Sequence, residues 1–97
     1  MVRNIALITS IDPSAVVKQF EKLDPTLRAF AADALAGLLN NPMPNAIRFE
    51  KLKGNNKPPI YTIHLTPNHS HKASFEIVNG VAKLRRIGTH KQVDNSP

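Results

Sequence analysis

The dipeptide Asn79-Gly80 constrains the fold of this chain more than any other feature. Both residues tolerate the positive φ angles of a type I′ turn, so the pair is the strongest short signal for a β-hairpin. The flanking segments, HKASFEIV and VAKLRRIG, alternate apolar and polar residues as half-buried strands do. The sequence therefore predicts an antiparallel pair of strands over residues 71–88.

Alternation and β-branched residues predict three further strands before this hairpin. They are RNIALIT at 3–9, IRFEKLKG at 47–54 and IYTIHL at 60–65. In the last of these, the apolar residues share one face, so His64 points to the opposite, polar face. The strand at 47–54 is expected to be short or irregular and to lie at an edge of the sheet.

Two Asp-Pro pairs predict helix starts, because Asp12 and Asp24 suit the N-cap and proline fits the first helical position. The segments that they open, DPSAVVKQFEKL and DPTLRAFAADALAGLL, carry apolar residues at helical spacing. The NNP at 40–42 is expected to end the second helix. The element order β-α-α-β-β-β predicts an α+β fold with a two-helix hairpin on one face of a small antiparallel sheet.

A length of 97 residues favours a single domain over residues 1–97, with a flexible tail at 92–97. The chain has no cysteine, which excludes disulfides, thiolate zinc ligands and a thiol nucleophile. The N-terminal apolar run is too short for a signal peptide, and no stretch approaches membrane-spanning length. We therefore expect a cytoplasmic location.

The net charge of +6 lies entirely in the second half of the chain. Residues 1–50 hold five basic and five acidic residues, whereas residues 51–97 hold eight basic and two acidic ones. Such asymmetry attracts polyanions, so nucleic acid or an acidic protein is the expected class of partner. A basic surface that serves only solubility is the alternative.

The polar face of the predicted sheet gathers groups that suit one reaction. Alternation puts His64 and Lys72 within cross-strand reach, and His90 follows the last strand toward the same region. Cleavage of RNA by its own 2′-hydroxyl needs a proton acceptor, a proton donor and fixed positive charge. Histidine supplies the first two near neutral pH and lysine the third, so the expected site needs no metal or other cofactor.

Each of these residues also has a simpler interpretation. His64 and His90 could be tolerated surface residues, and Lys72 could merely share the polar face with Glu76. The H-x-H pair at 69–71 could bind zinc, although the absence of cysteine and the scarcity of nearby carboxylates disfavour this.

The helical hairpin followed by KLKG, YTIHL, HKASFEIVNG and LRRIGTH resembles the RelE/ParE superfamily of toxins from bacterial type II toxin–antitoxin pairs. The resemblance covers nearly the whole chain, and only the combination of these short motifs is specific. It implies a RelE-like fold and, for the RelE and YafQ branch, an endoribonuclease that cuts mRNA in the ribosomal A site and so inhibits translation. It also implies an acidic antitoxin as partner, possible hetero-oligomers with it, and the ribosome and mRNA as targets.

The resemblance further implies roles for individual residues. His90 matches an acid–base position, and His64 matches a position used for acid–base work or charge stabilisation. Lys72 matches a phosphate-clamping arginine, so these three are the expected catalytic residues. The basic residues expected to contact RNA or the ribosome are Lys51, Lys53, Lys83, Arg85, Arg86 and Lys91.

Two departures from the family pattern leave a second function open. His71-Lys72 replaces the usual Tyr-Arg, and lysine offers a point charge instead of a bidentate fork. Asp94 stands where active relatives offer Tyr or Phe to stack a base. The alternative is a binding module, either a ParE-like inhibitor of DNA gyrase or a degenerate member that only binds its antitoxin.

Overall fold

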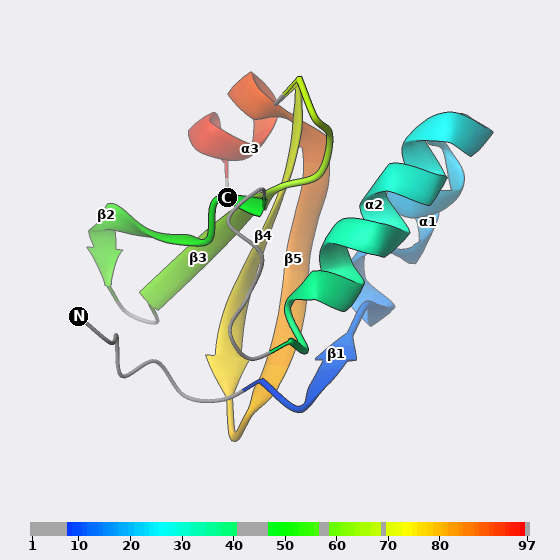
Figure 1. The fold of residues 1–97 in the computed structure, drawn as a ribbon. Coiled ribbons are helices and arrows are strands. Elements are labelled where there is room, and N and C mark those ends of the chain that lie inside the picture. The colour runs from blue at the N-terminus through cyan, green and yellow to red at the C-terminus, as the bar shows by residue number, and fades with distance from the viewer. Residues whose placement is uncertain (1–7, 41–46, 57–58, 69, 97) are drawn as a thin grey trace.

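The computed structural model describes residues 8–40, 47–56, 59–68 and 70–96, with only the backbone described for 52–56. These residues form an α+β fold with a five-stranded mixed sheet and three α-helices (Figure 1). In chain order the elements are β1 (Ser10–Asp12), the 3-10 helix η1 (Ser14–Val16), α1 (Val17–Glu21), α2 (Pro25–Gly37), β2 (Glu50–Asn56), β3 (Pro59–His64), β4 (His71–Val78), β5 (Val81–Thr89) and α3 (His90–Asn95). None of the described helices has the length and apolarity that a membrane span requires.

The sheet has the strand order β1-β5-β4-β3-β2. Neighbours from β5 to β2 are antiparallel as predicted, whereas β1 runs parallel to β5, with Ser10 opposite Val81. The prediction of a wholly antiparallel sheet is therefore wrong for β1. No hairpin joins β1 to β5, so no turn fixes their relative direction. The strand itself also begins later than the predicted 3–9, of which 3–7 lie outside the described residues.

The second Asp-Pro pair starts a helix as predicted. The Asp24 carboxylate accepts a hydrogen bond from the Leu27 backbone N–H at 2.9 Å, and Pro25 is the first residue of α2. The helix ends at Gly37, three residues before the predicted NNP stop.

The first Asp-Pro pair behaves differently. Asp12 is the last residue of β1, and its carboxylate accepts from the Ser14 backbone N–H at 3.0 Å, which opens η1. This hydrogen bond lowers the pKa of Asp12. The helix predicted from Pro13 is therefore divided into η1 and a five-residue α1.

Helices α1 and α2 cover one face of the sheet, and the apolar face predicted from alternation is buried beneath them (Figure 1). The buried residues of this core are Ile8, Val16, Ala31, Ala34, Leu38, Ile47, Ile63, Leu65, Ala73, Phe75, Ala82, Leu84 and Ile87. The ring of Tyr61 stacks with the rings of Phe49 and Phe75, which are tilted relative to one another, and the three centroids are 5.4–6.0 Å apart.

The predicted hairpin is confirmed. Asn79 and Gly80 both have positive φ, at 51° and 80°, as a type I′ turn requires, and Val78 pairs with Val81 directly beside the turn.

A β-bulge interrupts the pairing of β4 with β5. Phe75 lies opposite Leu84 and Ser74 lies opposite Arg86, so Arg85 is an extra residue in β5. Leu84 and Ile87 are buried in the core, whereas both arginines between them are exposed. The bulge thus turns two consecutive basic side chains toward solvent.

The last element, α3, lies at the end of β5 on the side away from α1 and α2, and it contacts β4 and β5 (Figure 1). Its residue Val93 is completely buried. The expectation of a flexible tail at 92–97 does not hold for residues 92–95, which belong to this helix. The polar sheet face is correspondingly less open than expected, since Thr62, Lys72 and Ser74 are all buried.

Candidate functional site

The strand register brings together the three residues expected to act on RNA. His64 in β3 lies directly opposite Lys72 in β4, and the rings of His64 and His90 have centroids 5.4 Å apart. The predicted proximity of these side chains is therefore confirmed. Together with Asp94, described next, we call His64, Lys72 and His90 the polar cluster.

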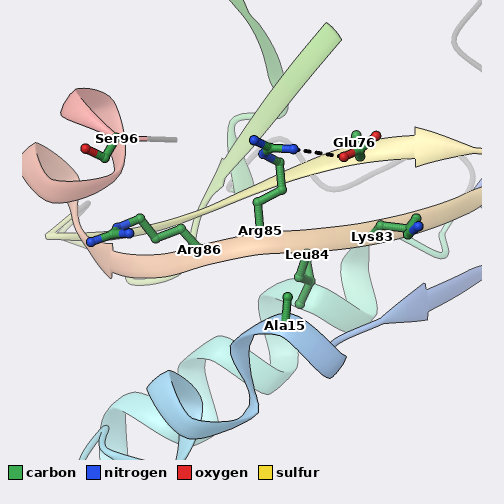
Figure 2. Close-up of a pocket in the computed structure, with 7 residues that line it drawn as sticks. All are labelled: Ala15, Glu76, Lys83, Leu84, Arg85, Arg86 and Ser96. Carbon is green, nitrogen blue, oxygen red and sulfur yellow. Dashed lines mark hydrogen bonds and ion pairs between the residues drawn. The ribbon is translucent and has the colours of Figure 1, made fainter. Parts of the chain in front are cut away.

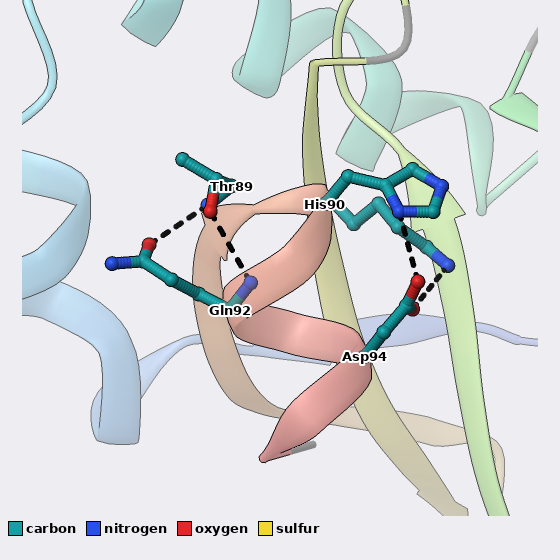
Figure 3. A network of polar contacts seen from close by, with 5 residues as sticks. Thr89, His90, Gln92 and Asp94 are labelled. Carbon is teal, nitrogen blue, oxygen red and sulfur yellow. Dashed lines mark hydrogen bonds and ion pairs between the residues drawn. The ribbon is translucent and has the colours of Figure 1, made fainter.

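Asp94 connects Lys72 with His90, although sequence analysis did not include it among the site residues. One carboxylate oxygen, Oδ1, accepts from Lys72 Nζ at 2.8 Å, and the other, Oδ2, lies 2.8 Å from His90 Nδ1. Figure 3 shows the His90 and Asp94 side chains pointing toward one another from α3. The carboxylate occupies the position where the resemblance led us to look for a stacking aromatic ring.

The members of the polar cluster differ sharply in exposure. The Lys72 side chain is 3% exposed, whereas those of Asp94 and His90 are 37% and 48% exposed. The His90 ring is therefore open to solvent, whereas the Lys72 ammonium group is buried and already paired with the Asp94 carboxylate. The role of Lys72 as a direct phosphate clamp, implied by the resemblance, does not match this geometry.

The turn from β5 into α3 is built by a capping box. Thr89 Oγ1 accepts from the Gln92 backbone N–H at 3.2 Å, and Gln92 Oε1 accepts from the Thr89 backbone N–H at 3.0 Å (Figure 3). A Cβ at Gly88 would lie 2.7 Å from Gln92 Oε1, so glycine permits this close approach. Because the helix starts at His90, one helical turn aligns His90 with Asp94.

The turn between β3 and β4 holds the start of α3. Thr66 Oγ1 accepts from the Ser70 backbone N–H at 3.0 Å, and the Ser70 carbonyl accepts from the His90 backbone N–H at 2.9 Å. His71 Nδ1 lies 2.8 Å from Ser70 Oγ. The other histidine of the H-x-H pair, His69, lies outside the described residues. Among those that are described, no group of three or more histidine and carboxylate side chains is placed to hold a metal ion.

The basic residues of β5 line an open depression of about 650 Å³ beside α1 and η1 (Figure 2). Lys83, Arg85 and Arg86 contribute to it, and Arg85 Nη1 is 2.9 Å from Glu76 Oε2. Figure 2 shows Arg86 directed toward the α3 end and Lys83 toward the opposite end. No member of the polar cluster is among the described residues that line the depression.

The remaining basic residues expected to contact RNA lie on other elements. Lys51 is exposed on β2 and Lys91 is exposed on α3. Lys53 belongs to β2, but its side chain lies outside the described part. Exposed basic side chains thus lie on β2, β5 and α3, outside the polar cluster.

Neither a family model nor a curated protein matches this sequence. Among solved structures, the solution structure of the conserved hypothetical protein HP0892 from Helicobacter pylori is similar at a TM-score of 0.43 and 22% sequence identity. The similarity covers 91% of this chain and 99% of that chain. At this level the similarity carries no conclusion about this chain.

Proposed function

We propose that this protein is the toxin of a toxin–antitoxin pair and acts in the cytoplasm as a ribosome-dependent mRNA endoribonuclease. The observation that carries the proposal is the pair of imidazole rings, His64 and His90, with centroids 5.4 Å apart and the carboxylate of Asp94 behind one of them. Two such groups can serve as proton acceptor and proton donor on either side of one phosphodiester.

The reaction needs only the RNA and these side chains. As the 2′-oxygen attacks phosphorus, its proton passes to one imidazole, and the P–O bond to the 5′-oxygen breaks with its electron pair on that oxygen. The other, protonated imidazole gives a proton to the leaving oxygen. The products are a 2′,3′-cyclic phosphate and a 5′-hydroxyl, and the two histidines end with their protons exchanged.

Lys72 enters this scheme through Asp94. Its buried ammonium group lies 2.8 Å from the Asp94 carboxylate, so it anchors the carboxylate against the sheet. The positive charge that draws the mRNA comes instead from the exposed basic residues of β5 and α3.

Purified protein added to ribosomes that carry mRNA in the A site tests the proposal. We expect cuts that leave a 2′,3′-cyclic phosphate and a 5′-hydroxyl, and relief of cleavage when an acidic antitoxin binds. Uncut mRNA together with inhibited gyrase would instead identify a ParE-like binding module.

One observation favours a second candidate, a catalytically degenerate toxin that only binds its antitoxin. Lys72 is already neutralised by Asp94, and no aromatic ring stands at position 94 to stack a base. Tight antitoxin binding with neither mRNA cleavage nor gyrase inhibition would support this candidate.

The basic residues of β5 are predicted to set affinity and not chemistry. Lys83→Ala or Arg86→Ala should weaken binding to the ribosome and reduce the slope of log affinity against log salt by about 1, because each phosphate contact releases counterions. Arg85→Ala should have a smaller effect, since Arg85 already pairs with Glu76. Binding measured at several salt concentrations checks this.

Lys18→Ala, a change at an exposed lysine of α1, is the matched control and should leave the salt dependence unchanged. Single-turnover cleavage at saturating protein should survive all three changes on β5. If Lys83→Ala or Arg86→Ala abolished it, the division between binding and chemistry would be wrong.

A further inference from the structure

We propose that Asp94 is the positioning residue that makes His90 the proton acceptor of the reaction and leaves the role of proton donor to His64. This inference rests on the proposed function. It assigns a separate task to each histidine. The sequence motifs and the proximity of the two rings do not distinguish the proton acceptor from the proton donor.

The contact between Asp94 and His90 fixes which ring nitrogen carries the proton. Asp94 Oδ2 lies 2.8 Å from His90 Nδ1, and an ionised carboxylate can only accept a hydrogen bond. The proton is therefore on Nδ1, and Nε2 keeps a lone pair that can take a proton from a 2′-hydroxyl. Once it does, the imidazolium faces the carboxylate, which stabilises its charge.

The carboxylate is held in place from the opposite side. Asp94 Oδ1 is 2.8 Å from Lys72 Nζ, whose side chain is only 3% exposed. Turning the carboxylate away would leave a buried ammonium group without its ion-pair partner, which is costly. The buried residue Val93, next in the chain, holds α3 against the sheet as well. An ordinary exposed ion pair one helical turn apart would lack this anchoring.

The same contacts assign the donor. Oδ2 of Asp94 faces Nδ1 of His90, so the carboxylate is placed to stabilise positive charge on that imidazole once it has accepted a proton. Among the described residues, the charged or titratable groups that meet the His90 ring or share its carboxylate partner include His64 from β3, Asp94 from α3 and, through Asp94, Lys72 from β4. Since Lys72 is buried and paired, His64 is the cluster member left to protonate the leaving oxygen.

A first experiment reads the ring of His90 without RNA. Nitrogen-15 NMR of the histidine side chains should show the His90 proton on Nδ1 in wild type and in Lys72→Met. The double variant Lys72→Met/Asp94→Asn should populate both tautomers, because an amide can either accept from or donate to Nδ1. Lys72→Met is included because Asp94→Asn alone would leave the buried Lys72 ammonium group without its charged partner. A wild-type proton on Nε2, or an unchanged tautomer in the double variant, would overturn the positioning role.

A second experiment separates acceptor from donor by using an mRNA whose scissile 5′-oxygen is replaced by sulfur. A sulfur leaving group needs no proton. The His64→Ala variant should therefore cleave this substrate on the order of 10²-fold faster than it cleaves normal mRNA, whereas His90→Ala should cleave both slowly. Restoration of His90→Ala instead would overturn the assignment. If wild type cuts neither substrate, the proposed function itself fails, and the NMR result still decides whether Asp94 orients His90.

Discussion

His90→Ala is expected to lower the single-turnover rate of A-site mRNA cleavage by on the order of 10²–10⁴-fold, the loss typical of one positioned acid or base. The fold should persist, because the His90 side chain is 48% exposed and its pairing with Asp94 is a half-exposed contact. Antitoxin binding should also persist. The measurement is cleavage on purified ribosomes with the protein in excess.

Asn95→Ala changes another exposed residue of α3 and is the matched control, for which we expect the wild-type rate. The wild-type rate should depend on pH because one imidazole must accept a proton and the other must donate one, and His90→Ala should lose one limb of that pH profile. Full activity with an unchanged profile would reduce His90 to a surface residue and remove the main support for the enzyme.

Asp94→Ala is expected to lower the free energy of unfolding by about 2–3 kcal/mol. The change leaves the ammonium group of Lys72, which is almost completely buried, without its ion-pair partner. Removing one partner of a fully buried ion pair costs about 3–5 kcal/mol, and we expect less here because Asp94 is 37% exposed and water can enter. The lost contact with His90 adds only about 0.3–0.5 kcal/mol. Urea denaturation of each variant measures these differences.

Lys72→Met supplies the control, since it removes the buried charge and keeps an unbranched side chain of similar length. Its free energy of unfolding should be at most about 1 kcal/mol below that of wild type, and it could exceed the wild-type value. In that background Asp94→Ala should cost no more than about 0.5 kcal/mol, as for an exposed position. An equal loss in both backgrounds would show that Asp94 stabilises the fold by some route other than Lys72.

The part of the site that lies on strands was predictable from the sequence. Alternation fixes which residues share a face, and Asn79-Gly80 fixes the β4–β5 pairing. The pattern therefore predicted the cross-strand approach of His64 and Lys72 correctly. It also predicted the buried apolar face beneath the helices.

The role of α3 was missed because its apolar content is a single residue, Val93, which gives no helical periodicity. The usable signal was local: Thr89 followed three residues later by Gln92 is a capping box, and it predicts a helix starting at His90. A helix there puts Asp94 one turn from His90, which would have placed Asp94 in the site.

Other features depend on tertiary contacts that no local pattern encodes. The parallel pairing of β1 with β5 joins segments about seventy residues apart along the chain. The burial of Lys72 depends on α3 folding back over the sheet. Alternation had assigned Lys72 to an open polar face.

The bulge at Arg85 also determines where the chain can change length. Elsewhere in β5, loss of one residue would reverse the faces of all residues on one side of it. Loss of either arginine yields the same shortened strand, in which a single arginine separates Leu84 from Ile87 and both apolar residues continue to point into the core. Within this strand, the arginine pair is therefore the site where a deletion removes one surface charge and leaves every other pairing with β4 intact.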